Sequence, residues 1–293
     1  MASVAEQQAD VFTEHRSLLF SIAYRMLGSV MDAEDAVQET YLRWQRASPD
    51  EVRSPKSYLS TVVTRLCIDH LRSAKTQREQ YIGPWLPEPL ITEETADMDE
   101  HLALADSLSM AFLVLLERLA PVERAVFLLR EVFDYGYPEI ARIVDKSEAN
   151  CRQMARRARQ HLAEHRRRFH ASPQQLGQIA QRFLQAATTG DVQSLLELLA
   201  DDVTVWSDGG GKVAAALNPI EGAEKVARFF VGIVKKAPPT FSVRPAHVNG
   251  GPGFLLYDGA QPYGVISADV ADGKVCGIHI VVNPDKLRRV PPL

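Results

Sequence analysis

A run of basic and amide side chains between residues 148 and 167 carries the clearest chemical signal in this chain of 293 residues. Arginine can bind phosphate or the O6 and N7 atoms of guanine, and asparagine or glutamine can pair with adenine. The candidate residues are Asn150, Arg152, Gln153, Arg156 and Arg157. An apolar stripe at helical spacing is formed by Cys151, Met154, Ala155, Ala158 and Leu162. The alternative is an ordinary solvated basic helix.

The elements before this helix favour DNA binding. A helix over 122–132 starts beside Pro121, where a missing N–H does no harm. A turn at 133–136 and a short helix over 138–144 follow, and Ser147 can cap the basic helix by accepting a backbone hydrogen bond. Two helices joined by a tight turn, the second exposing Asn, Gln and Arg, are typical of a helix-turn-helix.

Two further helices are predicted nearer the N-terminus. The stripe Ala33, Val37, Tyr41 and Trp44 predicts a helix over 32–46 with a mostly acidic exposed edge. Its exposed candidates are Asp35, Gln38, Glu39 and Arg43. In a helix over 58–72 we expect Leu59, Val62, Leu66 and Leu71 to face inward and Thr61, Thr64, Arg65, Asp69 and Arg72 to face outward. Periodicity alone supports no more than a helical bundle with solvated polar faces.

The charge is distributed unevenly along the chain. Residues 139–170 hold nine basic and four acidic side chains, whereas residues 1–138 hold 13 basic and 22 acidic ones. Residues 171–293 are balanced, with 11 of each. A basic block could meet a polyanion, and acidic surface could meet a basic protein. The tail 166–168, three consecutive arginines, could touch either phosphate or solvent.

Composition excludes several classes of protein. Hydrophobic residues make up 46% and charged residues 24%, which excludes a disordered or collagenous chain. Since no apolar run approaches the ~18 residues of a membrane span, we expect no membrane partner. The acidic N-terminus predicts no export signal. Three cysteines without a CxxC pair indicate a reducing cytoplasm and neither a disulfide framework nor a metal site, and we expect no cofactor.

Three stretches resemble one bacterial family. They are Asp32–Thr40 (DAEDAVQET), Ser57–Arg72, and Tyr137–Ala141 (YPEIA) followed by Ser147–Arg159. Together they resemble conserved regions 2 and 4 of the extracytoplasmic-function sigma factors, with only a linker between them. The resemblance implies a non-catalytic promoter-specificity subunit that binds core RNA polymerase and directs it to −10/−35 promoters.

The resemblance also assigns roles to residues. Asp35, Gln38, Glu39 and Arg43 match the surface that docks on the β′ clamp helices of the polymerase, and the β flap is the second expected polymerase contact. Arg65, Asp69 and Arg72, with the loop 46–56, match the part that reads and holds open the −10 element. Asn150, Arg152, Gln153, Arg156 and Arg157 match the helix that enters the −35 major groove.

The C-terminal part predicts an α+β domain. We expect helices over 174–189, 192–199 and 221–236, and strands over 203–206, 241–248, 253–257, 263–270 and 274–282 that form an antiparallel sheet. This part resembles the nuclear-transport-factor-2-like, or SnoaL-like, fold. The fold class is therefore multidomain: two all-α sigma domains plus one α+β domain. We expect domains over 8–76 and 107–170, a linker over 77–106, and the C-terminal domain over 172–293.

A subfamily of these sigma factors carries such a domain as a regulator in cis. Its three signature strings resemble residues 85–90 (WLPEPL), 208–213 (DGGGKV) and 283–287 (NPDKL). The implied regulatory contacts are Trp85, Leu86, Pro87, Asp208, Lys212, Asn283, Asp285 and Lys286. The alternative is that the first string only stiffens the linker.

Two other functions remain open from the residues alone. One is a one-component DNA-binding regulator that senses a ligand in the C-terminal pocket. The other is an isomerase- or cyclase-like enzyme, in which His279 would point into the cavity with Trp206 and Asp208 nearby for acid–base work.

Overall fold

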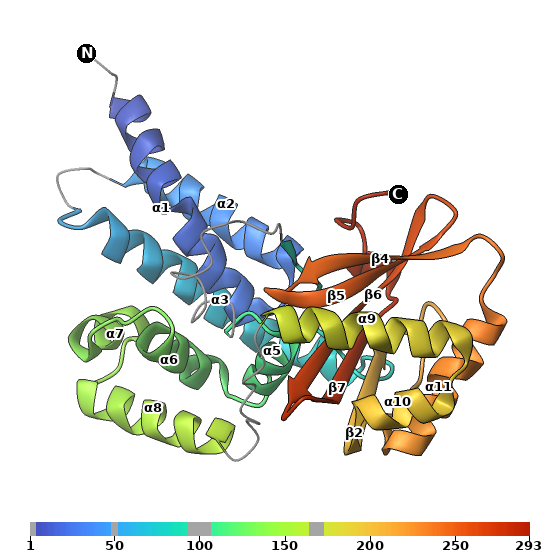
Figure 1. The fold of residues 1–293 in the computed structure, drawn as a ribbon. Helices are drawn as coiled ribbons and strands as arrows, with labels where there is room; N and C mark the ends of the chain where they lie inside the picture. Colours follow the sequence, from blue (N-terminus) through green and yellow to red (C-terminus); the bar gives the residue numbers. More distant parts are fainter. Residues whose placement is uncertain (1–3, 48–51, 93–106, 164–172) are drawn as a thin grey trace. The chain divides into compact units, whose positions relative to one another are not determined.

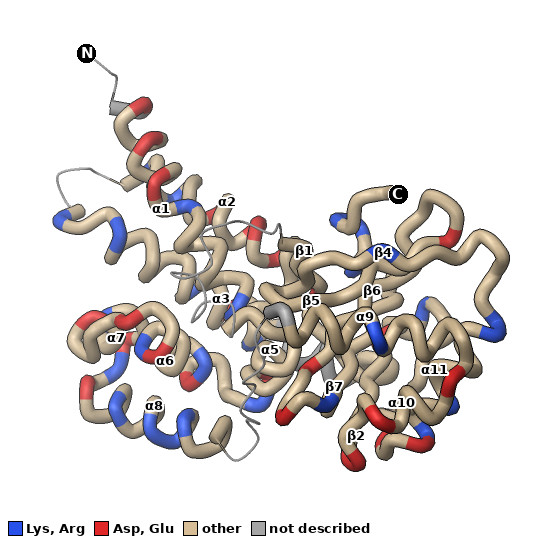
Figure 2. The backbone as a smooth tube through the Cα atoms, viewed as in Figure 1, with Lys and Arg blue, Asp and Glu red and all other residues tan. Residues whose placement is uncertain are grey.

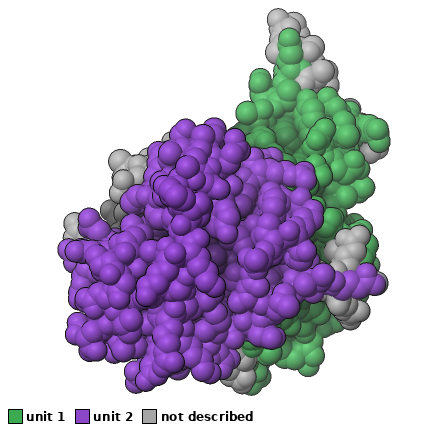
Figure 3. Space-filling model, turned by 90° about the vertical axis from the view of Figure 1, so that its right-hand side faces the viewer, with its two compact units in different colours: residues 1–79, 115–166 green, residues 80–114, 167–293 purple. Residues whose placement is uncertain are grey.

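The chain divides into two compact units in the computed structural model, which describes residues 4–47, 52–92, 107–163 and 173–293. The first unit comprises residues 1–79 and 115–166, and the second comprises residues 80–114 and 167–293 (Figure 3). The arginine tail 166–168, the acidic stretch 93–106 and part of the loop 46–56 lie outside the described residues. The segment that joins the two helical parts of the first unit therefore belongs to the second.

Three helices form the N-terminal part of the first unit: α1 (Val4–Leu27), α2 (Val30–Arg46) and α3 (Pro55–Glu79) (Figure 1). Gly28 has a φ of 66°, which lets the chain turn sharply after α1. Ser29 then caps α2, because its hydroxyl accepts a hydrogen bond of 3.2 Å from the Asp32 amide.

The core stripes of α2 and α3 differ in how well the sequence predicts them. On α2, Ala33, Val37 and Trp44 are buried, as expected. On α3 the expected pattern is partly wrong. Val63 and Cys67 are fully buried, whereas Val62 and Leu66 are only half-buried. Thr64, expected on the outside, is also fully buried. Apolar residues on both sides of α3 leave its inward face ambiguous in the sequence.

The second part of the first unit contains the helix-turn-helix, formed by α6 (Pro121–Glu131), α7 (Tyr137–Val144) and α8 (Glu148–Ala163). Asp145 adopts a left-handed conformation with φ 53° at the end of α7. The Ser147 hydroxyl accepts a hydrogen bond of 3.3 Å from the Asn150 amide, which caps α8 as predicted. The apolar stripe from Cys151 to Leu162 is buried.

The second unit is built on a seven-stranded sheet with the order β1-β4-β5-β6-β7-β2-β3. The strands are β1 (Ile91–Thr92), β2 (Leu199–Asp208), β3 (Ile220–Glu221), β4 (Phe241–Val248), β5 (Gly251–Asp258), β6 (Gln261–Ala271) and β7 (Lys274–Val281). The expected all-antiparallel sheet is wrong, since β2 runs parallel to β7 with Trp206 opposite His279. Alternation within a strand predicts its faces but not its neighbour or direction, so the sheet is mixed.

The two faces of this sheet are covered by different parts of the chain. The helices α9 (Pro173–Thr189), α10 (Val192–Leu198) and α11 (Ala223–Lys236) pack with side chains such as Val205 and Ile280 on one face. Leu86 of the linker and Met110 of α5 (Met110–Leu116) pack with Leu255, Tyr257 and Leu287 on the other. The linker is thus part of a hydrophobic core.

The linker also extends the sheet. Its strand β1 pairs antiparallel with β4 and places Ile91 opposite Val248. The amide of Leu90 donates to Oδ1 of Asn249 at 3.1 Å, and the amide of Asn249 donates to the Leu90 carbonyl at 2.8 Å. Asn249 also donates from Nδ2 to the Leu108 carbonyl at 3.1 Å. One buried asparagine therefore fastens both Leu90 of the linker and Leu108, just after the linker, to the sheet.

Candidate nucleic-acid, polymerase and regulatory surfaces

Arginines recur along α8, the second helix of the helix-turn-helix (Figure 2), and Arg152, Arg156, Arg157 and Arg159 are exposed. Asn150, Gln153 and Arg156 are exposed. Arg157 is paired with Glu123 of α6 at 3.0 Å, and Arg152 is paired with Glu148 at 3.0 Å. Within the described part of the chain Arg156 makes no ion pair. The surface can therefore offer amide and guanidinium donors to a polyanion.

The exposed edge of α2 presents the second predicted group of residues. Asp35 and Gln38 are exposed, and Glu39 accepts a hydrogen bond of 2.8 Å from Arg43 one turn later. Gln38 and Tyr41 also line a groove of about 350 Å³ between α1 and α2. The edge and the groove together offer a partner both charged side chains and a recess with mixed polar and apolar walls.

On α3 the predicted residues have different surroundings. Asp69 and Arg72 are exposed and 3.5 Å apart. Arg65 instead binds the C-terminal end of α7, where its guanidinium donates to the carbonyls of Ile143 at 2.8 Å and Arg142 at 2.9 Å. The last carbonyls of a helix lack partners within the helix and carry partial negative charge, so a cation is favourable there.

A second arginine makes the same kind of contact, but from the helix-turn-helix part of the first unit to a helix of the N-terminal part. Arg124 of α6 is buried and donates to the Met26 carbonyl at the end of α1 at 2.6 Å and to Glu117 at 2.7 Å. Burial lowers the pKa of Arg124 to about 10, which leaves it charged at neutral pH. A buried hydrogen bond of 2.7 Å between Ser60 and Tyr135 adds to this interface. The two helical parts of the first unit thus cap each other's helices.

In the second unit, one buried carboxylate holds the linker. Asp208 lies at the end of β2 and is fully buried. Its Oδ1 accepts hydrogen bonds from the Tyr81 hydroxyl at 2.6 Å and the Gly210 amide at 3.0 Å. Its Oδ2 accepts from the Leu86 amide at 2.9 Å and the Lys286 ammonium at 2.7 Å. Four donors satisfy the roughly four lone-pair sites of the carboxylate. We call this group the linker clamp.

The other regulatory candidates surround the linker clamp. The Lys286 ammonium lies 4.3 Å from the ring centroid of Trp85 and 5.1 Å from that of Tyr81, and it also donates to the Leu86 carbonyl. Asn283 donates to the Tyr81 hydroxyl at 2.8 Å. The remaining candidates are Pro87, Lys212 and Asp285. Pro87 is buried, and the Lys212 ammonium forms an ion pair with the Asp285 carboxylate. The structure therefore brings the three signature strings together.

Two members of the linker clamp escaped the sequence analysis. Tyr81 precedes the signature string and belongs to no periodic pattern, so no signal for it was present in the sequence. In the structure, partial burial and the Asp208 carboxylate raise the pKa of Tyr81. Gly210 has a φ of 61°, and a Cβ atom there would collide with the Asn283 amide. The signal for Gly210 was present, because a run of three glycines indicates positive φ or close approach.

The expectation that His279 points into the cavity is wrong. The cavity lies on the face of Ser207, Ile280 and Val282. His279 lies on the opposite face and stacks on Trp206 with 5.0 Å between ring centroids. The carboxylate beside His279 is Asp269, at 3.5 Å from Nδ1. Strand alternation separated the faces correctly but could not tell which face borders the cavity.

The chain was also compared with known proteins. Models of Sigma-70 region 2, Sigma-70 region 4 and a SnoaL-like domain match residues 11–77, 109–162 and 180–276. An extracytoplasmic-function RNA polymerase sigma factor of Mycobacterium tuberculosis, SigJ, is 37% identical over 96% of this chain and 93% of its own length. The probable sigma factor SigI of the same organism is 33% identical over 93% of this chain and 92% of its own length.

A solved structure is similar over almost the whole chain. The crystal structure of Mycobacterium tuberculosis SigJ superposes with a TM-score of 0.76 at 34% sequence identity. The match covers 97% of this chain and 98% of that one. No helix in the described ranges is both long and apolar enough to cross a membrane.

The Asp269–His279 pair predicts a pH dependence of stability. Burial raises the pKa of Asp269 from 3.8 to about 7 and lowers the pKa of His279 from 6.5 to about 3. The folded state holds the Asp269 proton more tightly than the unfolded state does. The contribution of this proton to the free energy of unfolding is therefore complete below pH 4 and is lost as the pH rises to 7. For His279 the unfolded state binds the proton more tightly, so its contribution to the free energy of unfolding is complete above pH 6.5 and is lost as the pH falls to 3.

We expect Asp269→Asn to remove the first of these losses. As the pH rises from 5 to 8, the free energy of unfolding of the variant minus that of the parent should increase by on the order of 2 kcal/mol. Thermal or urea unfolding at several pH values measures this difference. Asp201→Asn, at an exposed position of β2, is the control and should show no such gain. A difference in the free energy of unfolding between Asp269→Asn and the parent that stays the same at every pH would contradict the prediction.

Proposed function

This chain belongs to the extracytoplasmic-function sigma factors, and we propose that its C-terminal domain regulates it in cis by holding the linker between regions 2 and 4. The chain directs RNA polymerase to promoters for transcription initiation and has no catalytic activity of its own. Region 2 consists of α1, α2 and α3, and region 4 includes the helix-turn-helix. The observation that carries the proposal is the pair of hydrogen bonds that the buried Asp208 carboxylate accepts from the linker, from the half-buried Tyr81 hydroxyl and from the amide of the buried Leu86.

Regions 2 and 4 must separate before they read a promoter. The −10 and −35 elements are centred about 25 base pairs apart, which is about 85 Å at 3.4 Å per base pair. In the first unit, Arg65 of region 2 is bonded to the carbonyls of α7, which directly precedes the −35 helix α8. Arg65 is also a proposed −10 residue, so its bonds to α7 compete with its bonds to DNA.

The linker must lengthen when the regions separate. The segment between the two parts of the first unit, residues 80–114, contains most of the linker. It could span up to about 115 Å if fully extended, at about 3.3 Å per residue. Packing of Leu86 and Met110 on the C-terminal sheet and pairing of Ile91 with β4 oppose that extension. Opening the linker clamp would leave Asp208 buried without two of its donors, which is unfavourable. We infer that the clamp favours the closed pair of regions 2 and 4.

The finer contacts follow from the family's architecture. We infer that Asp35, Gln38, Glu39 and Arg43 dock on the β′ clamp helices and that region 4 binds the β flap. Arg65, Asp69 and Arg72 would serve the −10 element, and Asn150, Arg152, Gln153, Arg156 and Arg157 the −35 element. The protein would act with the polymerase in the cytoplasm. Exposure of the α2 edge and of α8 supports these assignments.

Gly210→Ala tests the linker clamp. The added methyl group collides with Asn283, so we expect the Leu86 amide to exchange hydrogen at least about tenfold faster. Run-off transcription at limiting core polymerase should increase. Gly273→Ala is the matched control, because its φ is also positive, at +76°, but nothing lies within 4 Å of the new Cβ. Tyr81→Phe, which removes one donor to Asp208, is a milder second variant.

Two results would contradict this proposal. Reduced transcription by Gly210→Ala and Tyr81→Phe, with the Leu86 amide exposed, would mean that the docked linker activates. Absence of any sigma-dependent transcript from the parent and both variants would contradict the assignment of promoter activity.

Asp35→Lys tests the polymerase surface. A reversed charge on the exposed edge of α2 should weaken binding to core polymerase by about tenfold or more and leave the melting temperature unchanged. Asp10→Lys, an exposed acid-to-lysine change on α1, is the control. Pull-down or fluorescence titration with core enzyme measures the affinity, and equal losses in both variants would contradict the assignment.

Arg156→Ala tests the −35 surface. Because Arg156 is exposed and makes no ion pair among the described residues, its loss should spare stability. It should weaken binding of the polymerase–sigma complex to a promoter selected from a random library by about 1–3 kcal/mol. Arg157→Ala should in addition lower the melting temperature, since it removes the pair with Glu123. Unchanged promoter affinity of Arg156→Ala would remove this residue from the interface.

A further inference from the structure

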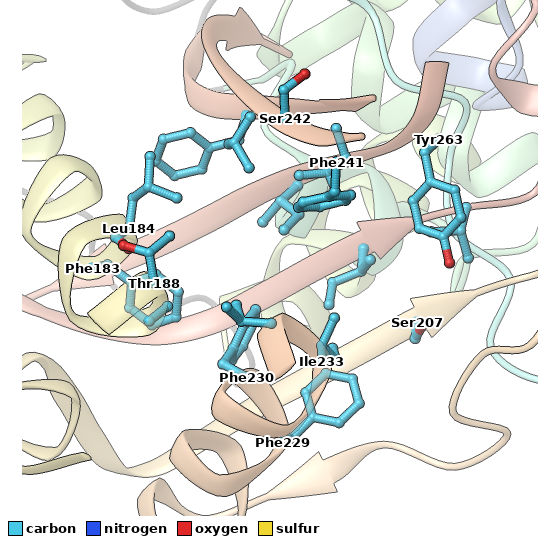
Figure 4. Close-up of a pocket in the computed structure, with 18 of the residues that line it drawn as sticks. Phe183, Leu184, Thr188, Ser207, Phe229, Phe230, Ile233, Phe241, Ser242 and Tyr263 are labelled. Carbon is cyan, nitrogen blue, oxygen red and sulfur yellow. The ribbon is translucent and has the colours of Figure 1, made fainter. Parts of the chain in front are cut away.

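A cavity of about 800 Å³ lies between the helix-covered face of the C-terminal sheet and the helices α9 and α11 (Figure 4). Aromatic rings form much of its wall, namely Phe183, Phe229, Phe230, Phe241, Phe254 and Tyr263. Among the residues that the structure describes, none that lines the cavity is charged. Neither the linker clamp nor the sigma regions contribute side chains to it.

We propose that this cavity binds a neutral, largely apolar small molecule with fused or multiple rings, and that its occupancy alters the linker clamp. The volume falls within the ~300–1,000 Å³ typical of sites for drug-sized ligands. A charged ligand would lose its hydration without meeting a countercharge, which excludes it from such walls. Aromatic faces favour flat ring systems, which can stack on them.

The mouth of the cavity is marked by exposed apolar side chains. Ile233 on α11 is 38% exposed and Tyr263 on β6 is 50% exposed, although both are large. Large exposed apolar side chains beside a recess are typical of a ligand site. Water fills such a recess poorly, because each water molecule needs two to four polar partners. The hydroxyl of Ser207, on the cavity wall, can orient one polar group of the ligand.

The cavity and the linker clamp meet at the end of β2 and at the residues that follow β7. Ser207 lines the cavity and its neighbour Asp208 holds the linker, and Val282 lines the cavity next to Asn283. The amides of Val282 and Asn283 both donate to the Asp208 carbonyl at 2.9 Å. A ligand that moves the cavity wall therefore displaces the clamp residues one peptide away. This regulatory half rests on the proposed function of the linker, whereas ligand binding itself does not.

Binding is tested by titrating the full chain with N-phenyl-1-naphthylamine, a neutral fluorescent molecule with two ring systems. We expect saturable one-to-one binding that Ile233→Trp and Ala216→Phe weaken at least tenfold, since both fill the cavity. Lys236→Trp and Asn218→Phe are matched controls on the same helix and the same loop. They are exposed, lie outside the cavity lining and should bind normally. Absence of saturable binding, or equal binding by all four variants, would overturn the proposal.

The coupling is tested by hydrogen exchange at the Leu86 amide with and without saturating probe. We expect at least a threefold change in the parent chain and none in Ile233→Trp. Binding without any change at Leu86 would overturn the coupling. No polymerase is used in either experiment, so the result is independent of the transcription tests above.

Discussion

The contact between the linker and the C-terminal sheet depends on a single buried carboxylate. Asp208 has no exposed surface, and a carboxylate in that position is tolerable only with a countercharge and a full set of donors. The sheet cannot supply these alone, since two of the four donors come from Tyr81 and Leu86 of the linker. The linker is therefore required for the electrostatic balance of the C-terminal domain. A regulator built in this way responds to anything that changes the surroundings of one side chain.

The closed first unit follows from a second constraint, the partial charge at helix ends. Each helical region supplies an arginine to the C-terminal carbonyls of a helix in the other, Arg65 to α7 and Arg124 to α1. Arg124 is buried and makes a structural contact, whereas Arg65 is exposed and also belongs to the proposed −10 surface. The same guanidinium cannot bind α7 and DNA at once. Under the proposed −10 role of Arg65, the closed and promoter-bound forms would exclude each other without any steric block.

The sequence predicted local features well and long-range ones poorly. The apolar stripe of α8 and the Ser147 cap are local and were correct. The parallel pairing of β2 with β7 joins segments about seventy residues apart, and no local pattern encodes it. Thr64 was misplaced because apolar residues flank both sides of α3. The signature strings were recognised by resemblance, but their shared centre at Asp208 required the fold.

The mixed topology of the sheet explains why the cavity and the linker can communicate. Parallel pairing aligns Ser207 with Ile280 and Asp208 with Val281, so both strands end at the same edge of the cavity and of the clamp. Successive residues of a strand point to opposite faces, which places ligand-facing and linker-facing side chains on adjacent positions. The hydrogen bonds to Asp208 span 2.6–3.0 Å and weaken steeply on distortion. Under the proposed coupling, a displacement of β2 changes the geometry of these hydrogen bonds and therefore how firmly the linker is held.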